Sequence, residues 1–260
     1  MIPKKIHYFW VGGNPKPESV LFCIESWKRY CPDYEIIEWN ESNYDFSKNR
    51  YMQQAYEAKK WGFVPDYARL DVIYQYGGIY LDTDVEAIRS FDSVLHNKAF
   101  FGFEKTTEKE HFVACGLGFG AEAGNTLVRE MRDAYEEVAF VQDNGKLNLL
   151  PSPQYNTRVL LKHGLQNQDK DQILDDAVVY ASDVLCPKMY CSSVTNLTDR
   201  TLSIHHYDAS WMDGERKRLH DINVRLNRLF GDKAGNTLSK WLEDTEYLFK
   251  AAVRRLREKL

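Results

Sequence analysis

Residues 66–84 (DYARLDVIYQYGGIYLDTD) constrain the fold more than any other part of this chain. Pro65 and the pair Gly77-Gly78 bracket a stretch with helical periodicity, and a short apolar strand then runs into Asp82-Thr83-Asp84. The two glycines permit the sharp turn that joins the helix directly to the strand. A buried strand that ends in acidic residues is typical of an open α/β sheet, which binds ligands at the carboxyl ends of its strands.

The two carboxylates at the end of this strand indicate a cation site. Asp82 and Asp84 are one residue apart, so their charges repel each other, and a cation or strong donors must lie nearby to keep both ionised. Oxygen ligands of this kind suit Mg²⁺ or Mn²⁺. Asp66 and Arg69 share a helix face three residues apart. On these residues alone, a helix-capping Asp66 with a surface Arg69 stays open as an alternative.

The remaining chain supports an α/β sheet flanked by helices, with a helical C-terminal extension. We predict a catalytic domain over residues 1–212 and a helical extension over 213–260 that packs on it, with a break between helices at residues 233–235. The predicted strands are residues 6–11, 34–39, 79–81, 99–103, 115–120, 177–180 and 201–205. The predicted helices are residues 18–30, 51–61, 66–76, 126–140, 154–161 and most of the chain from 213 onward.

Composition excludes several classes of protein. The formal net charge of -4 gives no global attraction to nucleic acid, so no nucleic-acid partner is expected. The five cysteines form no CxxC pair, so neither a disulfide framework nor a zinc site is expected and reduced thiols are the simpler interpretation. No window approaches the ~20 apolar residues of a membrane span, and the N-terminal apolar stretch is too short for a signal peptide. We therefore expect a cytoplasmic protein.

The last predicted helix leaves two interpretations open. It combines apolar residues with a basic end formed by Arg254, Arg255, Arg257 and Lys259. A solvated packing helix explains this pattern, and so does peripheral contact with the anionic inner face of a membrane. The second interpretation would suit an enzyme that acts on lipid-linked glycans.

Residues 66–84 resemble the core motif of the DXD-containing glycosyltransferases of family 32. These are related to fungal mannosyltransferases, bacterial capsular polysaccharide enzymes and the glucosylating clostridial toxins. Residues 5–13 (KIHYFWVGG) resemble the first strand of that group, and Trp27 falls in a helix where such proteins often carry a Trp. The likeness covers roughly residues 3–95 well and the rest loosely. It implies a GT-A-type nucleotide-sugar-binding sheet with a metal at the DXD.

The resemblance also implies roles for individual residues. Asp66 and Arg69 would hold the donor sugar, and Asp82 would contact ribose and sugar directly or through water, so that these three are the implied catalytic residues. Asp84 would bind the metal, Mn²⁺ or Mg²⁺. Trp10 would stack on the donor base, with the alternative that it is a core residue. The full set implied to bind the nucleotide-sugar donor is Phe9, Trp10, Val11, Tyr80 and Asp82.

A second cluster lies at residues 204–211 (IHHYDASW). A His-aromatic pair followed by a Trp resembles the late segment of GT-A enzymes, where one residue completes the metal shell. His206, next to Tyr207, fits that pattern better than His205, and the choice between the two histidines stays open. Imidazole suits Mn²⁺ better than Mg²⁺. The alternative is one buried and one exposed histidine without a ligand role.

The resemblance implies a retaining glycosyltransferase that moves a hexose from a UDP- or GDP-sugar to a glycan or glycolipid acceptor, in polysaccharide or capsule biosynthesis. Residues 115–120 (CGLGFG) lack the Lys-Ser/Thr of a P-loop, so we interpret them as a small-residue strand on the acceptor side.

Two other classes compete with this interpretation. A haloacid-dehalogenase-like phosphatase would use Asp82 and Asp84 with a later acidic pair, Asp175-Asp176. About eighty residues precede its nucleophile, however, and it leaves Trp10 and Arg69 unexplained. A non-catalytic carbohydrate-binding module would use the aromatic residues but would not need an acidic metal site.

Overall fold

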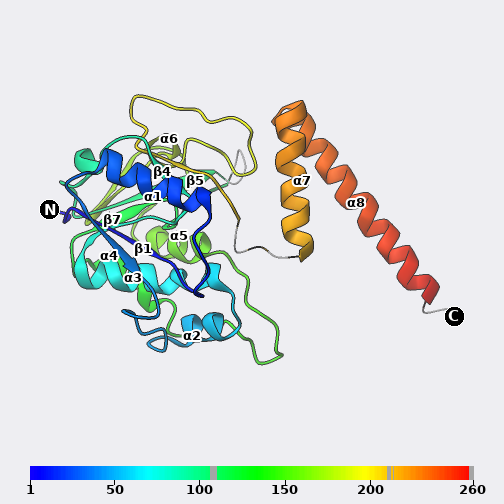
Figure 1. Cartoon of the computed structure of the whole chain (residues 1–260), viewed down its shortest axis with the longest axis horizontal. Helices are drawn as coiled ribbons and strands as arrows, with labels where there is room; N and C mark the ends of the chain where they lie inside the picture. The colour runs from blue at the N-terminus through cyan, green and yellow to red at the C-terminus, as the bar shows by residue number, and fades with distance from the viewer. Residues whose placement is uncertain (106–109, 210–211, 213, 258–260) are drawn as a thin grey trace. The chain divides into compact units, whose positions relative to one another are not determined.

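The computed structural model describes residues 1–105, 110–209, 212 and 214–257. The chain divides into two compact units (Figure 1). The described parts of Met1–Lys188 and Asn196–Trp211 form the first, which contains the sheet and the candidate site. The described parts of Met189–Thr195 and Met212–Leu260 form the second, which is mainly helical. No sequence pattern had indicated that Met189–Thr195 belongs with the helices.

The first unit is built on one mixed sheet in the order β2-β1-β3-β7-β5-β9-β8, with β6 paired to β5. Its strands are β1 (Lys5–Phe9), β2 (Glu35–Trp39), β3 (Gly78–Tyr80), β5 (Ala99–Lys105), β6 (His111–Val113), β7 (Phe119–Ala121), β8 (Gln172–Leu174) and β9 (Ala177–Tyr180). A separate antiparallel pair joins β4 (Val85–Ala87) to β10 (Ser203–His205).

Strand directions bring several carboxyl ends to one edge of the sheet. Strands β1, β2 and β3 are mutually parallel, and β7 is antiparallel to both β3 and β5. Strand β5 therefore runs in the direction of β3, and β9 is parallel to β5. Trp10, Asp82 and Ala181 follow three of these strands at the shared edge. This is the edge at which open α/β sheets bind ligands.

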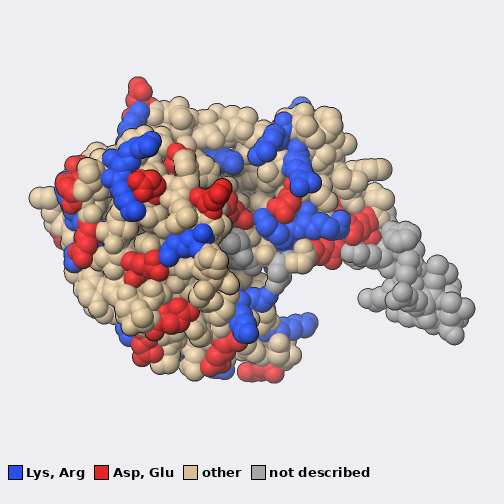
Figure 2. Space-filling view, viewed as in Figure 1, with Lys and Arg blue, Asp and Glu red and all other residues tan. Residues whose placement is uncertain are grey.

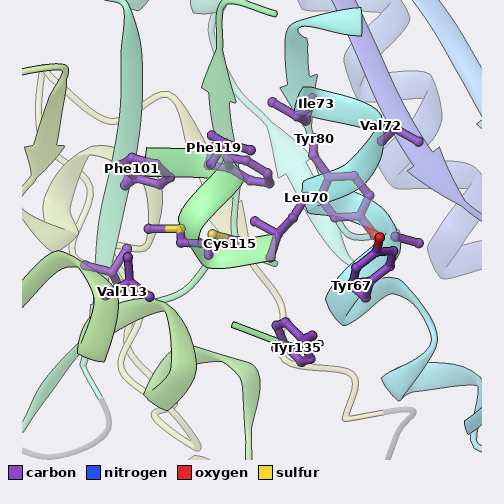
Figure 3. Close-up of a cluster of buried hydrophobic side chains, with 14 of the residues drawn as sticks. Tyr67, Leu70, Val72, Ile73, Tyr80, Phe101, Val113, Cys115, Phe119 and Tyr135 are labelled. Carbon is purple, nitrogen blue, oxygen red and sulfur yellow. The ribbon is translucent and has the colours of Figure 1, made fainter. Parts of the chain in front are cut away.

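Helices cover both faces of the sheet. Alternation along β1 sends Ile6 and Tyr8 into one core cluster and Phe9 into the other. The first cluster includes residues of α1 (Glu18–Tyr30) and α6 (Ser182–Leu185). The second includes residues of α2 (Arg50–Glu57), α3 (Pro65–Tyr76), α4 (Thr126–Asp133) and α5 (Ser152–Lys162). Figure 3 shows part of the second cluster, where Leu70 of α3 and Tyr80 of β3 lie near Phe119.

The predicted fold class is confirmed: the first unit is an open α/β sheet flanked by helices. The predicted limits of the helices at 18–30 and 66–76 are within one residue of the observed ones. The short 3-10 helices Trp61–Phe63 and Phe91–Val94 were not predicted.

The second unit contains α7 (Gly214–Phe230) and α8 (Asp232–Arg257). The predicted break at residues 233–235 is wrong, because the chain turns at Gly231, whose φ of 77° ends α7. Gly235 lies inside α8, where a Cβ would overlap the backbone of Asn227 on α7. A glycine at position 235 therefore allows α7 and α8 to pack closely.

None of the described helices combines the length and apolar character that crossing a membrane requires. The basic residues Arg254, Arg255, Arg257 and Lys259, on which the expected membrane contact depends, lie outside the residues whose side chains the structure describes. Figure 2 shows Lys and Arg side chains interspersed with Asp and Glu over the described part of one face, in agreement with the small net charge.

Candidate active site

The backbone around Asp82 is fixed on both sides. Leu81 N donates to His7 O at 3.1 Å, and Asp82 N donates to Gly116 O at 3.0 Å. Gly77 and Gly78 have φ values of 63° and 107°, as the predicted turn into the strand requires. A Cβ on Gly78 would lie 2.9 Å from His7 Nε2, so the glycine is needed for space as well. The strand thus delivers Asp82 to the ligand-binding edge of the sheet.

Arg69 joins the two aspartates that the sequence placed in the sugar site. Its Nη2 lies 2.7 Å from Asp66 Oδ1, and its Nη1 lies 3.3 Å from Asp82 Oδ2. Tyr51 OH donates to Asp66 at 3.2 Å, and Tyr80 OH donates to Asp82 at 2.8 Å. The alternative of a surface Arg69 is wrong, since Arg69 is only 4% exposed. Tyr80, expected to bind the donor, is buried and donates to Asp82.

Burial makes these carboxylates hard to ionise. Desolvation raises the pKa of Asp66 to about 6, although the charge of Arg69 opposes the change. Desolvation also raises the pKa of Asp82, again against Arg69, and the charge of Asp84 adds to the increase. A second cation beside Asp82, in addition to Arg69, would therefore stabilise the ionised form of Asp82.

Gly116 is a site residue that the sequence did not single out. A Cβ at this position would overlap the Asp82 carboxylate and would lie 2.7 Å from Arg69 Nη1. The CGLGFG segment thus supplies the space in which this ion pair forms. The predicted strand at residues 115–120 is shorter than expected, since only Phe119–Ala121 is extended in the sheet.

We expect Gly116→Ala to separate Arg69 from Asp82 and to reduce turnover about 10-fold to 100-fold, because displacement of catalytic groups by about 1 Å has effects of this size. Donor hydrolysis and the thermal melting temperature should be measured together. Gly13→Ala is the matched control for an added methyl group, since nothing lies within 4 Å of a Cβ there, although its φ of 68° adds some strain. Equal activity of Gly116→Ala and wild type would contradict the assignment.

Asp82, Asp84 and His205 form a group suited to a metal ion. Each offers a ligand atom within 4.8 Å of the other two, and His205 Nε2 lies 3.3 Å from Asp84 Oδ1. Burial alone would raise the pKa of Asp84, but the charge of His205 and its hydrogen bond lower it. Burial would likewise lower the pKa of His205, but Asp84 raises it well above its usual range. Two carboxylate oxygens with one imidazole nitrogen fit a divalent cation such as Mn²⁺.

The structure places His205, and not His206, with the aspartates. His205 is opposite Val85 in the β10–β4 pair, so it lies beside the residue that follows Asp84. Successive residues of an extended chain face opposite ways. His206 Nε2 accordingly bonds to Glu86 Oε2 at 3.0 Å. The expected choice of His206 as the ligand is therefore corrected to His205.

The chain after His205 holds Asp84 through its backbone. His206 N donates to Asp84 O at 2.9 Å, and Asp208 N donates to Asp84 Oδ2 at 3.0 Å. Tyr207 between them has a φ of 59°, which is unfavourable for a bulky residue. Strain of this kind persists where surrounding contacts fix the backbone, and it concentrates at functional sites. Trp211, part of the expected motif, lies outside the described residues.

The three residues at the end of β1 differ in exposure. Phe9 and Val11 are buried in the core, so the contacts expected of them with a donor would have to be made by the backbone. Trp10 is partly exposed, and its Nε1 donates to Asn14 O at 2.7 Å. Of the three, only the Trp10 ring is available for stacking on a nucleobase.

The acidic pair of the phosphatase alternative lies far from this group. Asp175 and Asp176 fall in the turn that precedes β9, at the opposite edge of the sheet from Asp82. Asp176 Oδ1 instead pairs with Lys98 Nζ at 2.7 Å. The structure therefore gives no support to a phosphatase site made from these four aspartates.

Residues 17–101 match the family model described as "Glycosyltransferase sugar-binding region containing DXD motif". This segment is thus similar to the DXD sugar-binding region of glycosyltransferases. The matched segment includes Asp66, Arg69, Asp82 and Asp84, and it leaves out Trp10 and His205. The predicted resemblance to DXD glycosyltransferases is confirmed.

Curated relatives match over part of their lengths. "Inositol phosphoceramide mannosyltransferase 3" of Schizosaccharomyces pombe is 33% identical over 107 residues, 38% of this chain and 29% of that protein. "Subversion of eukaryotic traffic protein A" of Legionella pneumophila is 22% identical over 170 residues, 55% of this chain and 26% of that protein. The aligned region thus spans less than a third of each of these two relatives.

Solved structures give a looser likeness. A chain described as "PaToxG Glycosyltransferase" has a TM-score of 0.49 at 22% identity, covering 62% of this chain and 69% of that one. A glycosyltransferase "involved in the glycosylation of the major capsid of PBCV-1" has a TM-score of 0.46 at 13% identity, covering 83% of this chain and 98% of that one.

Proposed function

We propose that this protein is a metal-dependent glycosyltransferase that moves a hexose from a UDP- or GDP-sugar to a glycan or glycolipid acceptor. One observation carries the proposal: in a DXD sugar-binding region, the Asp82–Asp84–His205 group lies beside the Arg69–Asp66 pair at the ligand-binding edge of the sheet. A mannosyltransferase among the relatives supports a hexose donor. The retaining outcome, the role in polysaccharide or capsule synthesis and the cytoplasmic location belong to this proposal.

Different residues of the site would bind different parts of the nucleotide-sugar donor. Trp10, at the end of β1, would stack on the base, and Asp84 with His205 would hold the divalent cation. A bound divalent cation would offset the negative charge that develops on the leaving diphosphate. Arg69 keeps Asp66 and Asp82 in place, so that their carboxylates face a sugar ring whose anomeric carbon becomes cation-like.

The proposal is tested by screening UDP- and GDP-sugars for hydrolysis with MnCl₂, with MgCl₂ and with a chelator. Release of nucleoside diphosphate from at least one hexose donor, dependent on metal, is expected. The anomeric configuration of the first product, observed by NMR, tests retention. Hydrolysis that proceeds equally in the chelator would contradict the metal role, and release of phosphate from a phosphomonoester would point to a different enzyme class.

The two histidines should differ in their effect on metal affinity. We expect His205→Ala to raise the Mn²⁺ concentration for half-maximal hydrolysis about tenfold or more, because it removes a ligand. His206→Ala should leave it near the wild-type value, since His206 bonds to Glu86. Mn²⁺ should also outperform Mg²⁺ in the wild type but lose that advantage in His205→Ala. Equal midpoints in all three proteins would remove histidine from the site.

Trp10→Ala should weaken nucleotide binding. Stacking of a base on an aromatic ring contributes ~1–3 kcal/mol, or roughly tenfold to a hundredfold in the dissociation constant. Calorimetry with UDP and GDP in the presence of MnCl₂ measures it directly. Trp241→Ala, which removes an exposed Trp from α8, is the matched control. An unchanged dissociation constant for Trp10→Ala would make Trp10 a core residue only.

A further inference from the structure

Glu104 lies at the same edge of the sheet as the candidate site but has no part in the donor and metal binding proposed for it. It is the last residue but one of β5, and β5 runs in the direction of β3. Asp82 follows β3, so the two carboxylates are at the carboxyl ends of two strands that point the same way. Only β7 separates these strands in the sheet.

Alternation along β5 gives the face on which Glu104 lies. Phe101 and Phe103 belong to the core cluster beneath α3. Gly102 and Glu104 therefore face the other side of the sheet. A Cβ on Gly102 would lie 2.9 Å from Leu185 of α6, which confirms the face. Tyr207 packs against the core cluster of this same face.

Charge links Glu104 to the metal-suited group. Glu104 is partly buried, and the charges of His205 and Asp82 both act on it. Burial raises the pKa of Glu104 to about 7, which His205 opposes and Asp82 reinforces. An acidic residue in such surroundings destabilises the protein when it ionises, so a benefit to function is a reason to retain it.

Glu104 differs from the other carboxylates of this edge in having no partner among the described residues. Asp66 and Asp82 are held by Arg69, Asp84 by His205, and Glu86 by His206. Within the part of the chain that the structure describes, the Glu104 carboxylate has neither a hydrogen bond nor an ion pair. Its acceptor capacity is therefore free for a ligand.

The order of the strands indicates which of the two substrates would lie near Glu104. Trp10 is at the end of β1, the donor-sugar residues are at β3, and β5 lies two strands further on. Neighbouring strands are about 4.8 Å apart, so Glu104 lies on the order of 10 Å beyond Asp82, away from Trp10. A donor whose base is at Trp10 and whose sugar is at Arg69 leaves this position to the second substrate.

We propose that Glu104 binds the acceptor, by accepting a hydrogen bond from the hydroxyl group that attacks the donor sugar. A carboxylate without a cationic partner repels anions and favours hydroxyl donors, so the reacting part of the acceptor is a neutral sugar or polyol. This inference rests on the proposed function and extends it to the acceptor.

The assignment is tested with Glu104→Gln in the full chain. Hydrolysis of the nucleotide sugar is measured, so that water takes the place of the acceptor hydroxyl. The probes are the nucleotide sugar that the wild type hydrolyses and, for calorimetry, UDP or GDP with MnCl₂. Turnover should fall roughly 10-fold to 100-fold through loss of orientation of the attacking group, while donor KM and nucleotide affinity stay within about twofold. Glu86→Gln, which removes a nearby carboxylate already bonded to His206, should keep turnover within about threefold.

A thermal melt without ligands separates this role from a structural one. At pH 8 Glu104→Gln should melt at or above the wild-type temperature, since it removes a partly buried charge. Wild-type turnover in Glu104→Gln, a parallel loss of nucleotide affinity, or a lower melting temperature would each overturn the assignment of Glu104 alone. A wild-type protein that neither binds nucleotide nor hydrolyses any nucleotide sugar would overturn the proposed function and this inference with it.

Discussion

Replacing Asp84 by asparagine should reduce metal-dependent turnover about 10²–10³-fold while the fold is kept. Loss of one preplaced electrostatic group at a transition-state site typically has an effect of this size. Asparagine keeps the shape of the side chain and an oxygen that can accept from Asp208 N, so the loop after His205 should stay in place. Steady-state hydrolysis of the nucleotide sugar in saturating MnCl₂ measures the loss.

Binding of the metal gives a second measurement on the same variant. A ligand that binds only the folded protein raises its melting temperature. MnCl₂ with nucleotide should therefore raise the melting temperature of the wild type, and raise that of Asp84→Asn much less. Asp176→Asn is the matched control, because Asp176 pairs with Lys98 at the opposite edge of the sheet. Equal turnover and equal stabilisation in Asp84→Asn and wild type would remove Asp84 from the metal site.

The parts of this site that are local in sequence could be predicted from it. Asp66 and Arg69 share one helix turn, and a Gly-Gly turn carries the chain from that helix to Asp82 within a few residues. Spacing and turn chemistry therefore place Asp66 and Arg69 on one helix face and Asp82 at the end of the next strand, whereas they leave the burial of Arg69 open. The same local logic located α1 and the strand at Glu35–Trp39.

The parts that depend on distant pairing could not be predicted. Either histidine could have faced Asp84, and the contact of His205 with Asp84 arises only because β10, far along the chain, pairs with β4. Gly116 meets Asp82 through a backbone hydrogen bond across more than thirty positions of sequence. Neither contact leaves a periodic signal, because a strand pattern predicts alternation but not the register of the partner.

Glu104 has a weaker signal of the same kind in the sequence. The run AFFGFEK is an apolar strand that ends in a charged residue, much as the strand before Asp82 does. An acidic residue at the carboxyl end of a buried strand is a candidate for the ligand-binding edge whether or not it belongs to a known motif. The motif at Asp82 is a stronger signal because its aspartates come as a pair.

Arg69→Met should destabilise the protein by about 3–5 kcal/mol, the usual range when one partner of a buried ion pair is removed. Arg69 and Asp66 are 4% and 5% exposed, so solvent cannot replace the lost partner. Without Arg69 the pKa of Asp66 should rise further, because the arginine charge opposes the effect of burial. Urea unfolding followed by circular dichroism measures the change in the free energy of unfolding.

The sign of the pH dependence follows from Asp66. A carboxyl group whose pKa is raised by folding gives its full stability below its unfolded pKa of 3.8 and loses it as pH rises through the folded value, about 6 in the wild type and higher in the variant. The deficit of Arg69→Met should therefore be larger at pH 8 than at pH 5. In an Asp66→Asn background the same substitution should cost less and lose the part of this pH dependence that Asp66 contributes, while Asp82, which Arg69 also holds, keeps its own part. Equal deficits at both pH values and in both backgrounds would mean that Arg69 stabilises the helix by packing alone, and that it does not hold Asp66 for the donor sugar.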